Sequence, residues 1–201
     1  MYLLFFSFKS LFFMIVLPTN IVIPVLTQKN TILRTLKNSD ASSLFLLINE
    51  NRNFLRKWLF WVDLTKEEND SLEFIVNSNK QQKEGKQLVF GIFYNDCICG
   101  TVGFVSIDQK NCSAELGYWL SPVLEGKGLI TSSCLALIDY SFMELGFYKI
   151  FSRALTDNHK SLSVFGRLGM HIEDGGKEFQ YFMGETAEFL MTKGTITNKY
   201  I

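Results

Sequence analysis

The segment that decides the fold reads Glu115-Leu-Gly-Tyr-Trp-Leu120-Ser-Pro-Val-Leu-Glu125-Gly-Lys-Gly-Leu-Ile130-Thr. It predicts a strand, a short linker, a glycine turn and a helix that begins near Leu129. Gly126 and Gly128 let the backbone approach a ligand closely, and the start of the helix adds unpaired N–H groups and the positive end of its dipole. The segment therefore predicts a phosphate cradle, although a glycine pair before a helix is as typical of an ordinary tight turn. The predicted helix has one apolar face, formed by Ile130, Cys134, Leu137, Ile138, Phe142 and Leu145.

Two common phosphate-binding motifs do not match this turn. The three-glycine fingerprint of dinucleotide folds is absent. A Walker loop is excluded as well, because Lys127 lies between the glycines and no Lys-Ser/Thr pair follows Gly128. The glycine turn must therefore be identified by its context along the chain.

The turn resembles the acetyl-CoA loop of the GNAT acetyltransferase superfamily, whose pattern is Gln/Arg-x-x-Gly-x-Gly/Ala. That pattern falls on residues 125–130, with Glu125 in place of Gln or Arg and Ile130 in place of the small last residue.

Two further segments resemble the branch of ribosomal-protein N-terminal acetyltransferases. Asn51-Arg-Asn-Phe-Leu-Arg-Lys-Trp-Leu-Phe-Trp61 is similar to its "N-R-x-x-L-x-x-W-L-x-W" helix segment. Residues 158–170, which begin Asn158-His-Lys-Ser161, are similar to another segment of that branch, "N-x-x-S-x-x-v-x-x-x-l-G-F". Met170 stands in the place of its aromatic residue. The three segments occur in the expected order, and the resemblance as a whole covers about residues 30 to 193.

The resemblance implies an α+β, GNAT-like fold: a mixed, mostly antiparallel sheet flanked by helices in a single domain. It implies acetyl-CoA as co-substrate, with the pantetheine arm in a gap beside the strand that precedes the glycine loop. A backbone N–H near Leu120 would meet the thioester carbonyl. The implied cofactor-binding residues are Trp119, Leu120, Gly126, Lys127, Gly128, Leu129, Ile130, Thr131 and Asn158.

Glu115 and Ser161 are the candidate catalytic residues. The amine must lose a proton to attack, so a carboxylate or an ordered water chain must accept it. Glu115 lies on the strand that faces the cleft, but a structural carboxylate is an equally good interpretation, and Tyr118 is an alternative base. Ser161 would protonate the leaving CoA, or is simply a serine on the helix surface. Asn158 suits a helix N-cap in addition to its implied role.

We expect direct transfer to a primary amine in a ternary complex, because no cysteine lies beside a histidine that would activate it. The resemblance favours a protein N-terminal α-amine, whose pKa near 7.7–8.0 is below the 10.4 of lysine. Two alternatives stay open: a small amine such as a polyamine or aminoglycoside, and a CoA-binding module without turnover, which Glu125, Ile130 and Met170 would suit. An acceptor pocket is expected from Phe54, Trp58, Phe60 and Trp61.

Composition limits the other function classes. The 201 residues suit one domain, and 20 basic residues balance 20 acidic ones, so nothing predicts a nucleic-acid partner. No spacing predicts a metal site. The four cysteines are expected to be reduced, buried thiols in a reducing, cytoplasmic compartment: Cys97, Cys99, Cys112 and Cys134.

Residues 1–28 form an apolar N-terminal extension, and residues 29–201 form the predicted acetyltransferase domain. Lys9 is the only charge before residue 27, and Lys9 and Pro18 interrupt a membrane span that would need about 20 residues. We interpret the extension as an upstream start in the reading frame, with a membrane anchor as the alternative. A homodimer is also compatible with the resemblance.

Local signals place the other elements. Apolar and polar residues alternate over residues 30–36, which predicts an edge strand. Asn38 or Ser39 is expected to cap the next helix, and Thr65-Lys-Glu-Glu68 is expected to form a capping box at the start of a later one. A two-residue turn, Asn95-Asp96, joins two strands. Further strands are expected at 111–120, at 148–154 and on both sides of Gly184, and a helix at 157–168 that Gly169 ends.

Overall fold

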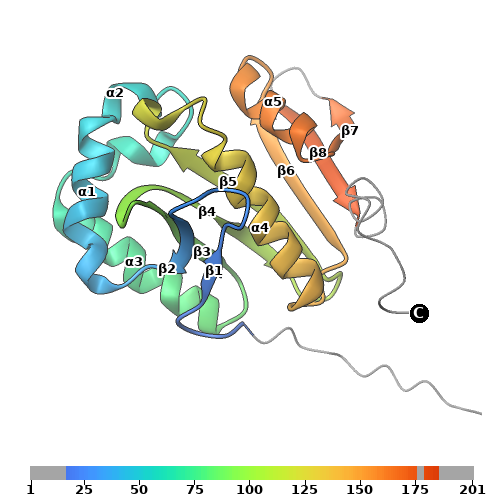
Figure 1. Ribbon diagram of the computed structural model, residues 1–201, viewed down its shortest axis with the longest axis horizontal. Helices are drawn as coiled ribbons and strands as arrows, with labels where there is room; N and C mark the ends of the chain where they lie inside the picture. The colour runs from blue at the N-terminus through green and yellow to red at the C-terminus, as the bar shows by residue number, and fades with distance from the viewer. Residues whose placement is uncertain (1–16, 176–178, 186–201) are drawn as a thin grey trace, which may run out of the picture.

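The computed structural model describes residues 17–175 and 179–185 of the chain. Eight strands form one sheet in the order β1-β2-β3-β4-β5-β6-β8-β7 (Figure 1). Every neighbouring pair is antiparallel except β5 and β6, which are parallel. The mixed, mostly antiparallel sheet predicted from the sequence is therefore confirmed. The strands are β1 Val22–Pro24, β2 Thr31–Thr35, β3 Leu88–Tyr94, β4 Cys97–Asp108, β5 Ser113–Leu120, β6 Lys149–Leu155, β7 His171–Gly175 and β8 Phe179–Glu185.

Helices cover both faces of the sheet, so β3 is buried on both sides. Its side chains alternate: Phe90 and Ile92 join a core with α4 and α5, whereas Val89 and Phe93 join a core with α1 and α3. The helices are α1 Ala41–Glu50, α2 Arg52–Leu55, α3 Glu68–Lys83, α4 Leu129–Met143 and α5 His159–Arg167, with short 3₁₀ turns η1 Asn38–Asp40, η2 Phe60–Asp63 and η3 Pro122–Leu124.

Several local predictions are confirmed. Asn95 and Asp96 form the turn between β3 and β4, both with positive φ, as a type I′ hairpin turn requires. Gly169 follows the end of α5 with φ +75°. The four cysteines have free thiols, but the expected burial is wrong for two of them: Cys99 and Cys134 are buried, whereas Cys97 is exposed and Cys112 is half-buried.

Two predicted helix caps are wrong. Asn38 and Ser39 lie in η1, and the residue before α1 is Asp40, whose carboxylate accepts from the Lys37 N–H at 2.7 Å. At α3 the carboxylate of Asp70 accepts from two backbone N–H groups just before the helix, while the Thr65 hydroxyl donates back to a carbonyl of η2. In each case a nearby aspartate offers the stronger, charged acceptor.

Two strand predictions are also corrected. β2 is not an edge strand, because β1 pairs with it from Val22↔Arg34 to Pro24↔Ile32. Gly184 lies inside β8, opposite Ile150 of β6, rather than between two strands. The rest of the range predicted to hold these strands, beyond Glu185, lies outside the described residues.

Within the described part of the chain, no helix is long and apolar enough to span a bilayer. The same residues contain no cluster of His, Cys, Asp or Glu suited to a metal ion.

Candidate functional site

A fork between β5 and β6 is the central feature of the site. The two strands pair at three positions, from Ser113↔Lys149 to Glu115↔Phe151, and both then continue without pairing to each other. The buried Ser152 hydroxyl donates to the Leu116 carbonyl at 2.7 Å, which makes a side-chain link where the ladder stops. Beyond this link the strands leave a gap with a free edge of β5.

The alternation of the backbone decides which residues of β5 face this gap. A residue in a strand directs its N–H and C=O to the same side, and the next residue directs them to the other. The Leu116 carbonyl faces β6 and the Ser121 N–H faces β4, where it donates to the Cys99 carbonyl at 2.8 Å. By this parity the backbone groups of Tyr118 and Leu120 face the gap. The backbone of Trp119 faces β4, so its contribution to the site comes from its side chain.

The glycine turn lies at the end of β5 and leads into α4. Gly126 and Gly128 have φ of +76° and +77°, a left-handed conformation that costs other residues energy, and Gly128 is the N-cap of α4. Residues 129–131 form the first turn of the helix, whose N–H groups have no partner within the helix. Two conformationally free glycines and a helix N-terminus fit a pyrophosphate group.

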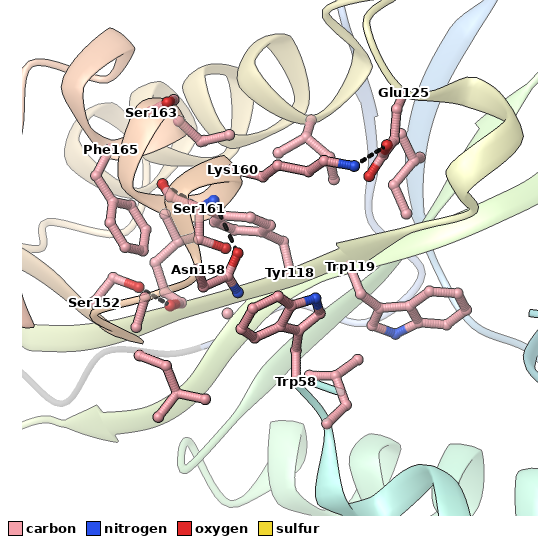
Figure 2. Close-up of a pocket in the computed structure, with 18 of the residues that line it drawn as sticks. Trp58, Tyr118, Trp119, Glu125, Ser152, Asn158, Lys160, Ser161, Ser163 and Phe165 are labelled. Carbon is pink, nitrogen blue, oxygen red and sulfur yellow. Dashed lines mark hydrogen bonds and ion pairs between the residues drawn. The ribbon is translucent and has the colours of Figure 1, made fainter. Parts of the chain in front are cut away.

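The N-terminus of α5 forms the other wall of the gap (Figure 2). Asn158 caps the helix, as predicted, because its Oδ1 accepts from the Ser161 N–H at 3.2 Å. The Tyr118 hydroxyl donates to the Ser161 carbonyl at 3.4 Å, and its ring packs edge-on against Phe165. Burial raises the pKa of Tyr118 well above its ordinary value. This phenol keeps its proton at neutral pH and suits a hydrogen-bond donor, not a base.

Two ion pairs connect opposite sides of the cavity. Arg153 of β6 donates to Glu115 Oε1 at 2.7 Å, and the Glu115 side chain is 13% exposed. Lys160 of α5 contacts Glu125, beside the glycine turn, at 2.5 Å (Figure 2). The Glu125 carboxylate, unusual for the loop pattern, therefore has a cationic partner across the gap.

All of these features line one cavity of about 1420 Å³. Every predicted site residue lines it except Lys127, whose ammonium lies 5.7 Å from the centroid of the Tyr94 ring instead. The aromatic segment predicted as an acceptor pocket lines it too, and the Trp61 ring lies 6.1 Å from that of Trp119. Sequence reasoning missed the cations in the lining, because no local pattern separates them from surface charges: Arg56, Lys57, Arg153, Lys160 and Arg167.

This geometry agrees with the comparison to known proteins. The model of the acetyltransferase (GNAT) domain matches residues 30–171. The chain belongs to the GNAT acetyltransferase family. It is 33% identical over 153 residues to a putative ribosomal N-acetyltransferase, YdaF, of Bacillus subtilis, covering 76% of this chain and 84% of that protein. To the ribosomal-protein-serine acetyltransferase of Escherichia coli it is 26% identical, covering 74% and 83%.

A solved acetyltransferase structure has the same architecture. The microcin C7 self-immunity acetyltransferase MccE, in complex with acetyl-CoA and AMP, superposes with a TM-score of 0.76 at 26% identity, covering 85% of this chain and 98% of that one. Together with the family match, this confirms the predicted fold and an acetyl-CoA-dependent N-acetyltransferase.

Proposed function

We propose that this GNAT enzyme acetylates the N-terminal α-amine of a protein, of the ribosomal-protein type that two of its relatives are named for. The charge of the cavity carries this choice over a polyamine or an aminoglycoside. Among the described residues that line it, Glu115 and Glu125 are the only carboxylates, and each is already paired with a cation. The same lining holds five Lys and Arg side chains, so it offers the ammonium groups of a polycation no unpaired carboxylate.

The co-substrate would lie along the fork. The glycine turn and the first turn of α4 would hold the pyrophosphate with backbone N–H groups. The backbone groups of Tyr118 and Leu120 would pair with the pantetheine amides. The Leu120 N–H is the donor best placed to stabilise charge on the thioester oxygen, because it faces the gap at the end of β5.

The proton transfers are assigned to side chains of the same cavity. Glu115 would accept the amine proton through Oε2 or a bound water, because its Oε1 already accepts from Arg153. Ser161, in the first turn of α5, would donate a proton to the leaving thiolate. The acyl group would pass directly to the amine, since burial raises the pKa of Cys99 to about 12 and likewise raises that of Cys134, so neither thiol is a ready nucleophile.

A thiol-release assay tests the acceptor. Peptides that begin with Ser, Ala or Met would be compared with spermidine and an aminoglycoside at equal concentration. We expect turnover with a peptide and little with the polycations; turnover with the polycations alone would contradict the proposal.

The base assignment has its own test. Glu115→Gln is expected to lower kcat by about 10²- to 10⁴-fold, the range for loss of a general base. Arg153→Gln distinguishes loss of the ion pair from loss of the base, because it removes the cationic partner and keeps the Glu115 carboxylate. Glu50→Gln, on the exposed end of α1, is the matched control. A normal rate in Glu115→Gln would assign the proton to a water chain.

A further inference from the structure

The segment from Leu17 to Gln28 precedes the part of the chain that the GNAT model matches, yet it is packed into the molecule. Ile21, Ile23 and Val25 are buried in the same core as the α4 residues, and β1 makes the sheet pairing with β2 described above. The chain then turns beside the start of α4 (Figure 1). This segment therefore lies close to the glycine loop.

The turn between β1 and β2 is held by its own backbone. The Gln28 N–H donates to the Val25 carbonyl at 2.9 Å, and the Val25 and Thr31 N–H groups donate within the same turn at 3.1 and 3.3 Å. The backbone of Gln28 thus has a defined position, from which its half-buried side chain reaches the glycine loop.

The Gln28 amide meets the loop at its centre. Gln28 Nε2 donates to the Lys127 carbonyl at 2.9 Å, across 99 positions of sequence. A Cβ atom added to Gly128 would lie 3.1 Å from this nitrogen. The bonded carbonyl belongs to the one peptide unit that joins Lys127 to Gly128.

A trans peptide unit directs its C=O and its N–H to opposite sides. With the Lys127 carbonyl directed to Gln28, the Gly128 N–H is directed away from Gln28. Gly128 lines the cavity and Lys127 does not, in agreement with this orientation. Without a bond to this carbonyl, the peptide plane between Lys127 and Gly128 is free to rotate, because Gly128, with φ +77°, has no Cβ to restrict its backbone.

We propose that residues 17–28 are part of the acetyltransferase domain, and that Gln28 is a positioning residue that aims the Gly128 N–H at the phosphates of CoA. The inference rests on the proposed role of the glycine turn. It predicts that a substitution of Gln28 weakens the binding of ligands that carry the phosphates of CoA and leaves the binding of ligands without them unchanged.

The test uses the full chain with Gln28→Ala, Gln28→Glu and, as the matched control in the same turn, the exposed Thr27→Ala. Calorimetry should show that Gln28→Ala binds CoA about 2- to 12-fold more weakly than the wild type. This range corresponds to the loss of one neutral hydrogen bond of ~0.5–1.5 kcal/mol, since a tenfold change in affinity is 1.36 kcal/mol. Gln28→Glu keeps the shape but offers no donor and should bind CoA more weakly still. Thr27→Ala should match the wild type.

A second ligand separates positioning from general damage. Pantetheine lacks the phosphates, so its inhibition constant should be the same in wild type and Gln28→Ala, whereas a disturbed fold would weaken both ligands. Equal CoA affinity in wild type and Gln28→Ala would overturn this inference alone. Failure of the wild type to bind CoA would overturn the proposed cofactor site itself. Deletion of residues 1–16 should leave CoA affinity unchanged, and a loss on that deletion would contradict the boundary at Leu17.

Discussion

The hydrogen bond at the base of the fork provides the sharpest test of the structure. Ser152 and Leu116 are both 2% exposed, and the Ser152 hydroxyl donates to the Leu116 carbonyl at 2.7 Å. Ser152→Ala removes the donor and leaves this buried carbonyl without that partner. An unsatisfied buried polar group costs about 1–3 kcal/mol. For a protein of this size 1 kcal/mol corresponds to about 2–4 °C in Tm, so Tm should fall by about 2–12 °C.

Ser133 of α4 is the matched control. It is also fully buried, but its hydroxyl has no hydrogen-bond partner in the structure. Ser133→Ala removes an unsatisfied polar atom and gains about 0.5 kcal/mol of helix propensity. Its Tm should equal or exceed that of the wild type, although the chemical change is the same.

Thermal unfolding monitored by circular dichroism measures both variants under identical conditions. Ser152→Ala should also raise the KM for acetyl-CoA, because the link fixes the point where the strands separate, while Ser133→Ala should leave KM unchanged. A Tm of Ser152→Ala within about 1 °C of the wild type, or an equal loss in Ser133→Ala, would contradict this role of the Ser152 hydrogen bond.

Three further results are expected. Asn158→Ala should lose about 0.5–2 kcal/mol of stability in urea because the cap of α5 is lost, whereas Asn158→Asp keeps an acceptor and should retain that stability. Burial by itself raises the pKa of Asp40, but hydrogen bonds from Arg34 and a backbone N–H, with the charge of Arg34, lower it below its ordinary value overall. The resulting stabilisation is present above about pH 4 and is lost as pH falls through the folded-state pKa, so urea melts from about pH 5 to 2 should show a smaller loss for Arg34→Gln than for wild type. Tyr118→Phe should leave the acidic limb of the pH–rate profile in place, since a phenol with a raised pKa is not the base; a shift of that limb would contradict this.

The local features of this protein could be predicted from its sequence. The helix after Gly128 was predictable because apolar residues recur at the helical period, and the turn at Asn95-Asp96 because these residues tolerate positive φ. The cap at Asn158 was predictable for the same kind of reason, since its acceptor lies three residues from its donor. Each of these signals lies within a single helix, turn or cap. The errors at the first residues of α1 and α3 were local too, because several capping residues stand close together there and propensity does not choose among them.

The tertiary structure alone decided the parts of the site that depend on distant residues. Glu115 meets Arg153 from 38 positions away, and Glu125 meets Lys160 from 35, so no spacing in the sequence connects the partners. The end of the β5–β6 pairing depends on where two strands diverge, which neither strand encodes by itself. The addition of β1 to the sheet likewise depends on packing, because the apolar residues from Leu17 to Val25 supply both a short strand and part of the core under α4. Periodicity and turn chemistry specify the elements because they act on neighbouring residues, whereas strand register and charge pairing depend on contacts that exist only after the chain has packed.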